Sequence, residues 1–405
     1  MTQVQLDVAI VLAAGAGTRM KSDTPKVMHQ IAGRTIIGHV LNEVNSLSPK
    51  DLRIVVGHGR EVVEPHVKEI APSAKAVIQA EQNGTGHAVQ LALADLNTTG
   101  TVLILAGDTP LLRNETLGEF IEAHSKNKNV ASVLTAELPD PTGYGRIVRG
   151  GDGEIVGIIE ERDATEEVKA IDEINTGVYL FDIATLKENV KKLKNNNSQG
   201  ELYLTDVIAE IKNNGGKAAA ILSLDYTETL GINDRTQLAE CAAIMRDRIN
   251  DGHMRAGVTI TDPTTTWIDA TVEIESDVTI LPGSWLTGKT SVAKNAVIGP
   301  RTTLKDVIVK ANAHVFESNV NGSEIGCCAN VGPFSFIRPG TKLSDNAKVG
   351  AYVEIKNSAI GEGSKIPHLS YVGDAQIGDG TNIGAATIFV NYDRSEEHTS
   401  ELQSH

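Results

Sequence analysis

The hydrophobic pattern of the chain changes its period once, close to residue 234. Before that point, short aliphatic runs alternate with stretches whose apolar residues recur at helical spacing. The runs 8–14, 52–57, 75–80, 101–108 and 131–138 read as buried strands, and 35–47 and 86–96 read as helices. Strands that alternate with helices predict an α/β domain over residues 1–234, with a mostly parallel sheet covered on both faces.

A single helix is predicted where the two patterns meet. Leu238, Ala242, Met245 and Ile249 recur at helical spacing, and Asp234 stands where a residue can cap the helix N-terminus. We therefore expect a linker helix over residues 235–251.

From residue 252 on, one aliphatic residue recurs every six positions. The positions are Ile268, Ile274, Ile280, Leu286, Val292, Ile298 and Leu304, then Ile325, Val331, Ile337, Leu343, Val349 and Ile355, and after two five-residue steps Ile360, Ile366, Val372, Ile377 and Ile383. This period fits neither a helix nor a two-sided hairpin. It predicts a solenoid over residues 252–393, with three short strands per coil and one inward aliphatic side chain per strand.

Composition narrows the class of protein. The 405 residues exceed what one hydrophobic core usually organises, and 37 Lys and Arg against 52 Asp and Glu give a formal charge of −15, which argues against a general nucleic-acid surface. Cys241, Cys327 and Cys328 form no disulfide framework. Neither a signal peptide nor a membrane-spanning run is apparent, so we expect a cytoplasmic protein without an integral membrane segment.

Candidate chemistry begins directly after the first predicted strand, in the stretch "LAAGAGTRMKSDTPK". Gly15 and Gly17 let backbone N–H groups approach phosphate oxygens, and Arg19 and Lys26 add positive charge there. A tight turn with surface charges is the simpler alternative. A dinucleotide site fits less well because Met20 replaces the third glycine, and no GK[ST] follows as in a Walker loop. The pattern favours a triphosphate.

The same stretch resembles the signature of the sugar-1-phosphate nucleotidyltransferases. The segments "QAEQNGTGHA", "LAGDTPLL", "PTGYGRIV", "IIEERDAT", "EINTGVY" and "GINDRTQL" follow in the order of that family. The period-six ladder resembles the left-handed parallel β-helix of hexapeptide-repeat acyltransferases. Over about residues 6–393 the chain is similar to bacterial bifunctional enzymes that join both halves. The resemblance implies a Rossmann-like first domain, a left-handed β-helix behind it and homotrimers formed along the solenoid.

The resemblance also implies roles for residues of the first domain. Leu12, Ala13, Ala14, Gly15, Ala106 and Gly107 would lie along the nucleotide; Gln79, Gly84 and Thr85 would read the base; Arg19 and Lys26 would bind the triphosphate; Asp108 and Asn233 would hold Mg²⁺; and Gly145, Glu160 and Asn175 would contact the sugar. Taken singly, Asp108 could be a strand-end turn residue, and Glu160 and Asn175 could be solvated loop residues.

The reaction implied is uridylyl transfer from UTP to N-acetylglucosamine-1-phosphate, which yields UDP-N-acetylglucosamine and pyrophosphate. The attacking phosphate oxygen is already anionic, so no general base is needed. The barrier comes from bringing two polyanions together, and we expect catalysis by positioning and by charge neutralisation.

The solenoid carries a second candidate site. His368 interrupts the ladder, and Arg338 and Lys356 lie one coil of eighteen residues apart, where they can bind a phosphate. A solvated histidine at a solenoid corner is the simpler alternative. By resemblance, the acceptor is glucosamine-1-phosphate and the donor is acetyl-CoA; His368 would be the base, Arg338 and Lys356 the phosphate ligands, Tyr371 and Asn382 sugar contacts, and Ala385, Asn391 and Tyr392 the start of the acetyl-CoA site.

The family pattern breaks after Tyr392, where "NYDG" is replaced by "NYDR". Residues 394–405, "RSEEHTSELQSH", carry no ladder, and all but the last residue match the translation of a common sequencing adapter. We therefore expect a non-native tail, missing terminal coils and loss of acetyl transfer. A natural polar tail is the alternative.

Two other functions compete with this interpretation. One is a nucleotidyltransferase for another NTP and sugar-1-phosphate, against which the set of His368, Arg338 and Lys356 argues. The other is a non-catalytic assembly subunit, against which the presence of Arg19, Lys26, Asp108 and Asn233 argues.

Overall fold

The computed structural model describes residues 6–391 of the chain. These residues form two compact units, and the division falls between Cys241 and Ala242. Each unit has its own hydrophobic core. Tyr392 and the predicted tail 394–405 lie outside the described residues.

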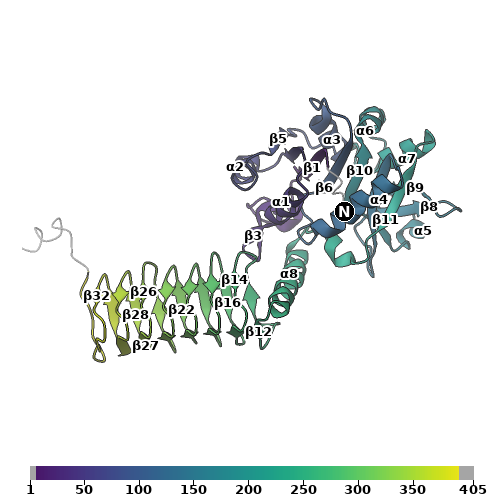
Figure 1. Cartoon of the computed structure of the whole chain (residues 1–405). Helices are drawn as coiled ribbons and strands as arrows, with labels where there is room; N and C mark the ends of the chain where they lie inside the picture. Colours follow the sequence, from purple (N-terminus) through teal and green to yellow (C-terminus); the bar gives the residue numbers. More distant parts are fainter. Residues whose placement is uncertain (1–5, 392–405) are drawn as a thin grey trace, which may run out of the picture. The chain divides into compact units, whose positions relative to one another are not determined.

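The first unit is built on a sheet of nine strands (Figure 1). Its main path runs β11-β7-β10-β6-β1-β4-β5. The strands are β1 (Val8–Ala13), β4 (Asp51–Val56), β5 (Lys75–Ile78), β6 (Thr101–Ala106), β7 (Ala131–Glu137), β10 (Glu173–Asp182), β11 (Ala218–Leu222) and the hairpin β8 (Arg146–Arg149) and β9 (Ile155–Ile159). All neighbours on the main path are parallel except β10, which runs antiparallel to β6 and β7.

Helices cover both faces of this sheet. One face is covered by α1 (Ile36–Ser46), α2 (Arg60–Ile70) and α4 (Asn114–Lys126), and the other by α3 (Thr85–Leu93), α6 (Ile183–Asn189) and α7 (Asp206–Asn213). Alternate residues of β1 enter the two cores, with Val8 and Ile10 in one and Ala9 and Val11 in the other. The predicted Rossmann-like α/β architecture is confirmed.

Short elements complete the unit. They are η1 (Thr18–Met20), η2 (Lys26–Met28), β2 (Gln30–Ile31), β3 (Arg34–Thr35), η3 (Glu161–Asp163), α5 (Glu166–Lys169), η4 (Val190–Lys192) and η5 (Tyr226–Thr229).

Two details of the sheet differ from the sequence-based expectation. The run 75–80 was expected to be a buried strand, but β5 is the edge strand and Ile78 is 46% exposed, because only β4 pairs with it. The long strand β10 was not predicted, and its antiparallel direction cannot be read from a buried apolar run.

The predicted linker helix is present as α8 (Arg235–Arg255). Asp234 Oδ1 accepts hydrogen bonds from the backbone N–H groups of Thr236 and Gln237, both at 2.9 Å, so the predicted cap is confirmed. The helix ends at Arg255 rather than at residue 251, since helical hydrogen bonding continues through the polar residues that follow.

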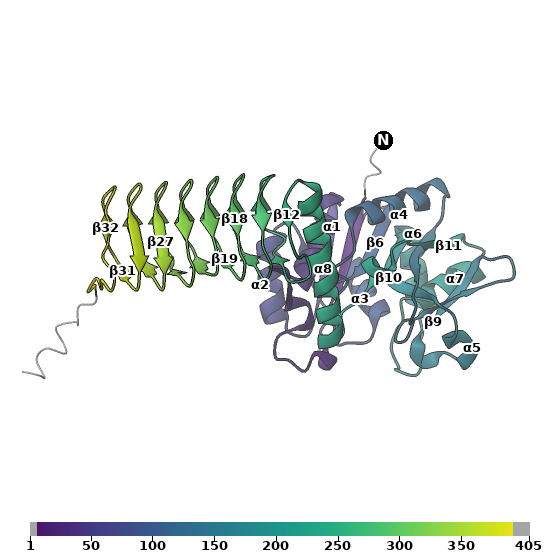
Figure 2. The same ribbon diagram turned by 90° about the horizontal axis from the view of Figure 1, so that it is seen from below.

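The second unit is a solenoid of three parallel sheets, each with seven strands, stacked from β12 to β32 (Figure 2). One sheet contains β12 (Thr259–Ile260), β15 (Thr279–Ile280), β18 (Val297–Ile298), β21 (His314–Val315), β24 (Asn330–Val331), β27 (Lys348–Ala351) and β30 (Lys365–His368). The next contains β13 (Trp267–Ile268), β16 (Trp285–Thr287), β19 (Thr303–Lys305), β22 (Asn319–Asn321), β25 (Phe336–Ile337), β28 (Glu354–Lys356) and β31 (Tyr371–Gly373). The third contains β14 (Glu273–Ile274), β17 (Ser291–Val292), β20 (Ile308–Val309), β23 (Glu324–Ile325), β26 (Lys342–Leu343), β29 (Ala359–Ile360) and β32 (Gln376–Ile377).

The aliphatic ladder forms the core of this left-handed β-helix, as predicted. The sequence pattern left a gap between Leu304 and Ile325, which the structure fills with buried Val309, Val315 and Val320. The corners favour residues that tolerate positive φ, such as Asn295 and other Asn, Asp and Gly residues at equivalent positions.

Candidate active sites

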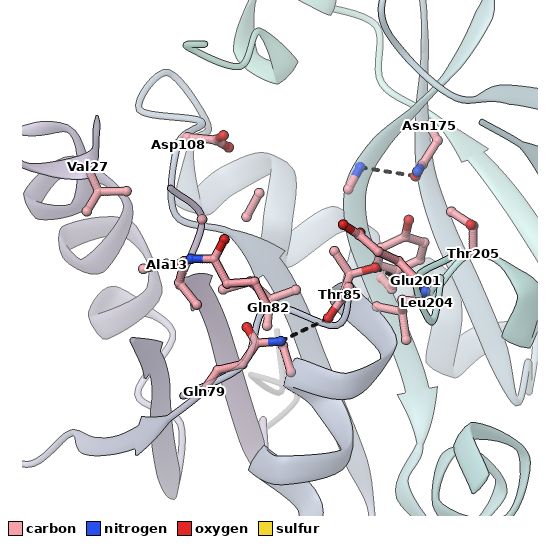
Figure 3. A pocket seen from close by; sticks show the side chains of 18 of the residues that line it. Ala13, Val27, Gln79, Gln82, Thr85, Asp108, Asn175, Glu201, Leu204 and Thr205 are labelled. Carbon is pink, nitrogen blue, oxygen red and sulfur yellow. Dashed lines mark hydrogen bonds between the residues drawn. The ribbon is translucent and has the colours of Figure 1, made fainter. Parts of the chain in front are cut away.

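A cavity of the first unit opens at the C-terminal ends of β1 and β6 (Figure 3). Its volume is about 370 Å³. Predicted site residues that line it are Leu12, Ala13, Ala14, Gly15, Lys26, Gln79, Gly84, Thr85, Ala106, Asp108, Glu160 and Asn175. The structure thus gathers residues from five separate motifs around one space. This is the edge of a parallel sheet at which ligands bind.

Lys26 marks one end of the cavity. Its Nζ contacts Asp108 Oδ2 and lies 3.3 Å from Asn233 Oδ1, so the two predicted metal ligands converge on one cation. The backbone N–H of Ile232 also donates to the Asp108 carbonyl oxygen at 3.0 Å. A carboxylate and an amide oxygen suit Mg²⁺, which usually keeps waters and substrate phosphates as its other ligands. Within residues 6–391 no group of three or more His, Cys, Asp and Glu side chains could hold a metal.

The glycine loop brings this lysine into place. Gly17 has φ +60°, and a Cβ at this position would lie 2.6 Å from Lys26 Cβ. The loop therefore needs glycine both for its conformation and for its approach to η2. Gly107 N–H donates to the Leu12 carbonyl oxygen at 2.8 Å, which ties the ends of β6 and β1 together. Among the described residues, those that line the cavity include neither Gly107 nor Arg19, which is exposed on η1.

A second group of polar side chains lies beside β5 and the start of α3. Gln79 is 5% exposed, and its Nε2 donates to the Gly84 carbonyl oxygen at 3.1 Å (Figure 3). Gln82 Nε2 donates to the Ala14 carbonyl oxygen at 2.9 Å, which links this segment to the glycine loop. Gln82 was not predicted as a site residue, although it stands within the motif "QAEQNGTGHA" that the sequence displays.

Glu160 and Asn175 form the opposite end of the cavity. Burial raises the pKa of Glu160, the nearby carboxylates of Asp206 and Asp163 raise it further, and a hydrogen bond from Thr205 acts in the other direction. Thr205 Oγ1 donates to Glu160 Oε1 at 3.2 Å.

Gly145 stands close against both of these residues. A Cβ on it would lie 3.4 Å from Glu160 Oε2 and 3.5 Å from Asn175 Cβ. Its carbonyl oxygen accepts a hydrogen bond from Asn175 N–H at 2.8 Å. The three predicted sugar-contacting residues are therefore neighbours in space.

Several cavity residues were missed by the sequence analysis. Besides Gln82, they are Val27, Ala88, Gly177, Tyr179, Glu201, Leu204 and Thr205. Glu201, Leu204 and Thr205 come from one segment that docks on α3, since Leu204 N–H donates to Thr85 Oγ1 at 3.0 Å. No local sequence pattern in this segment predicts its contact with α3.

The solenoid places most of its predicted site residues near its last coils. The register aligns Ile337 with Ile355, so Arg338 and Lys356 follow on adjacent strands of one sheet. Arg338 pairs with Glu354 at 2.9 Å, and Lys356 Nζ lies 3.7 Å from Asp374 Oδ2.

Two further predicted residues stand beside this pair of cations. Glu354 aligns with Tyr371 in the next coil. Asn391 Nδ2 donates to Tyr371 Oη at 3.2 Å. His368 is exposed at the end of β30, and Asn382 and Ala385 are exposed in the coil that follows.

The first unit has the fold and the charged cavity of a nucleotidyltransferase, and it is joined in one chain to a hexapeptide-repeat solenoid. Residues 9–165 match the family described as MobA-like NTP transferase domain. The chain is 49% identical to the bifunctional protein GlmU of Streptomyces avermitilis over 408 residues, which cover 100% of this chain and 85% of that protein. Bifunctional protein GlmU of Corynebacterium diphtheriae is 48% identical with the same coverage. The chain belongs to the GlmU family.

Within residues 6–391 no helix combines the length and the apolar character needed to cross a membrane.

Proposed function

We propose that the cavity of the first unit carries out uridylyl transfer and that the last coils of the solenoid bind the acceptor of acetyl transfer. The chain belongs to the GlmU family of UDP-N-acetylglucosamine diphosphorylases and glucosamine-1-phosphate N-acetyltransferases, whose product feeds peptidoglycan synthesis. The loss of acetyl transfer expected from the sequence stays a prediction. We assign the first activity to residues 1–234 and the second to 252–393.

The observation that carries the first assignment is the meeting of Lys26, Asp108 and Asn233 at one end of the cavity. In the proposed complex the uridine lies along the glycine loop and against Gln79, Gly84 and Thr85. The sugar lies toward Gly145, Glu160 and Asn175. This arrangement leaves the phosphates beside Lys26, with Arg19 reaching them from η1.

The reaction in this complex is a displacement at phosphorus. A phosphate oxygen of N-acetylglucosamine-1-phosphate attacks the α-phosphorus of UTP, and the bond to the β-phosphate oxygen breaks, so pyrophosphate leaves. Lys26 holds positive charge beside the transferred group, where negative charge concentrates. Mg²⁺ held by Asp108 and Asn233 would supply further charge neutralisation. Because the nucleophile is already anionic, the cavity needs to orient and neutralise rather than to remove a proton.

The test is a pyrophosphate-release assay over a panel of nucleoside triphosphates and sugar-1-phosphates. We expect UTP with N-acetylglucosamine-1-phosphate to be the preferred pair, and release to require a divalent cation. A preference for another NTP with glucose- or mannose-1-phosphate would contradict the assignment and favour a different nucleotidyltransferase.

For the solenoid, we propose that Arg338 and Lys356 bind the phosphate of glucosamine-1-phosphate, that Tyr371 and Asn382 contact its sugar, and that His368 removes the amine proton. Ala385, Asn391 and Tyr392 would begin the acetyl-CoA site. Two cations on adjacent strands of one sheet support this placement.

A binding measurement tests the solenoid site without requiring turnover. We expect Lys356→Ala to weaken glucosamine-1-phosphate binding in calorimetry, since it removes one phosphate ligand. Lys342→Ala, which removes a lysine from a different sheet, should not. Equal affinities for all three proteins would contradict the assignment. We further propose that the protein is cytoplasmic and that it forms a homotrimer. Sedimentation of the whole chain would test the trimer.

A further inference from the structure

Lys26 contacts both Asp108 and Asn233 at the cavity. The two segments that carry these residues also contact each other away from the cavity. Arg113, just before α4, donates a charged hydrogen bond to Glu228 Oε1 on η5. Thr116 Oγ1, in the first turn of α4, donates to Glu228 Oε2 at 2.6 Å. Both oxygens of one carboxylate are therefore held by the segment that follows Asp108.

This carboxylate is deeply buried. The Glu228 side chain is 1% exposed, whereas Arg113 is 46% exposed and reaches it from the surface. The bond to Glu228 raises the pKa of Arg113, so the guanidinium stays charged. Burying a carboxylate is unfavourable unless it is paired, and an apolar side chain of similar size often gives equal stability. Stability alone therefore does not account for this ion pair. Its position in the chain, close to both Asp108 and Asn233, indicates another role.

Arg113 follows Asp108 by five residues, and Glu228 precedes Asn233 by five residues. Between these ends, Ile232 N–H donates to the Asp108 carbonyl oxygen at 3.0 Å. The β6–α4 loop and the segment from η5 to α8 are thus connected at three successive points. The first is the Glu228 carboxylate, the second is the Ile232 hydrogen bond, and the third is Lys26, which contacts both metal-ligand side chains. None of Arg113, Thr116 and Glu228 is among the described residues that line the cavity.

We propose that Arg113, Thr116 and Glu228 form a positioning clamp that fixes the separation of Asp108 and Asn233 and so sets the affinity of the transfer site for its divalent cation. The proposal rests on the metal-binding role given above to Asp108 and Asn233. Groups that hold metal ligands in place typically change metal affinity about 10- to 100-fold when they are replaced. The clamp acts through the ligands and is not itself catalytic.

The test is a Mn²⁺ titration of the whole chain with UTP and without sugar phosphate. Binding is followed by water-proton relaxation, which responds to metal on the slowly tumbling protein rather than on free UTP. Glu228→Gln and Arg113→Met should weaken Mn²⁺ binding about tenfold or more, and Thr116→Val by less, because it removes one neutral hydrogen bond. Affinity for UTP in the absence of metal should stay unchanged. If the substitutions instead disturbed the structure of the whole site, UTP would bind more weakly as well.

The matched control is Arg149→Met. It removes another two-pronged ion pair of the same unit, in which Arg149 Nε and Nη2 each lie 2.7 Å from a carboxylate oxygen of Glu173. Its Mn²⁺ affinity should equal that of the unchanged chain. If Glu228→Gln does not fold, Arg113→Lys, which keeps the charge but loses the fork, should still show weakened Mn²⁺ binding.

The Asp108→Asn variant distinguishes a failure of the proposed clamp from a failure of the metal-binding role given to Asp108. If it weakens Mn²⁺ binding while folded clamp variants bind Mn²⁺ normally, the clamp is wrong and the metal assignment stands. If Asp108→Asn itself leaves Mn²⁺ binding unchanged, the metal assignment is wrong and the clamp falls with it.

Discussion

Glu160 shows how a single side chain acquires its properties from the fold. On its own, the segment "IIEERDAT" gives no reason to prefer this glutamate over Glu161. In the folded unit Glu160 lines the cavity beside Asn175, and burial raises its pKa. A buried carboxylate of this kind lowers the free energy of unfolding, but it also places a hydrogen-bond acceptor where a ligand can reach it.

The raised pKa of Glu160 predicts a pH-dependent effect of Glu160→Gln. Because the folded pKa lies above the ordinary 4.5, the folded protein binds this proton more readily than the unfolded chain does. Above the folded pKa, the buried charge lowers stability in full; as the pH falls through that pKa, the loss disappears. Glu160→Gln should therefore raise the melting temperature at neutral pH and have little effect at about pH 4. Thermal denaturation at both pH values measures this, and a lower melting temperature at neutral pH would contradict it.

The residues that sequence reasoning found and missed differ in a simple way. Lys26 and Asp108 stand in loops directly after predicted strands, where ligand contacts are expected. Glu201 and Thr205 reach the cavity only because their segment docks on α3 through Leu202 and Leu204. Contacts of that kind depend on tertiary packing, so the residues that make them carry no local signal.

At the scale of elements, the solenoid was the most predictable part of the chain. Each strand contributes one inward aliphatic residue, so a one-dimensional period records the three-dimensional stacking. Between Leu304 and Ile325 the pattern missed the core residues, because steps shorten to five residues there, as from Leu304 to Val309 and from Val315 to Val320. The direction of β10 was not predictable, because its partners are set by topology and not by its own residues.

Neighbouring residues of β25 provide a direct test of this alternation. Ile337 is fully buried, whereas Phe336 is 39% exposed although it is larger. Ile337→Ala should lower the free energy of unfolding of the solenoid by about 2–5 kcal/mol, since it leaves a cavity in a closely packed core. Phe336→Ala should lower it less, by about 1–2 kcal/mol, because the ring is already partly in water and its removal leaves no enclosed cavity. Denaturant unfolding of both variants measures the difference, and the reverse order would show that the register is wrong.

On the scale of the whole molecule, the chain consists of two compact units with separate cores. The residues proposed for uridylyl transfer all come from the first unit, and those proposed for acetyl transfer all come from the second. Compact units with their own cores can in principle fold alone.

This organisation predicts that the first activity does not need the solenoid. A chain of residues 1–255, which ends with α8, should fold and release pyrophosphate from UTP and N-acetylglucosamine-1-phosphate at a rate close to that of the full chain. Circular dichroism establishes folding and the coupled assay gives the rate. A folded but inactive 1–255 chain would mean that residues beyond Arg255 complete the site.

The central claim is that Lys26 and Asp108 form the charged end of a uridylyl-transfer site. The most direct measurement is the single-turnover rate of UDP-N-acetylglucosamine formation in the unchanged chain, Lys26→Ala and Asp108→Ala, with UTP, N-acetylglucosamine-1-phosphate and Mg²⁺ saturating. Each substitution should slow the step about 100- to 1,000-fold or more, because each removes charge stabilisation at the transferred phosphorus. Rates like that of the unchanged chain in either folded variant would contradict the account.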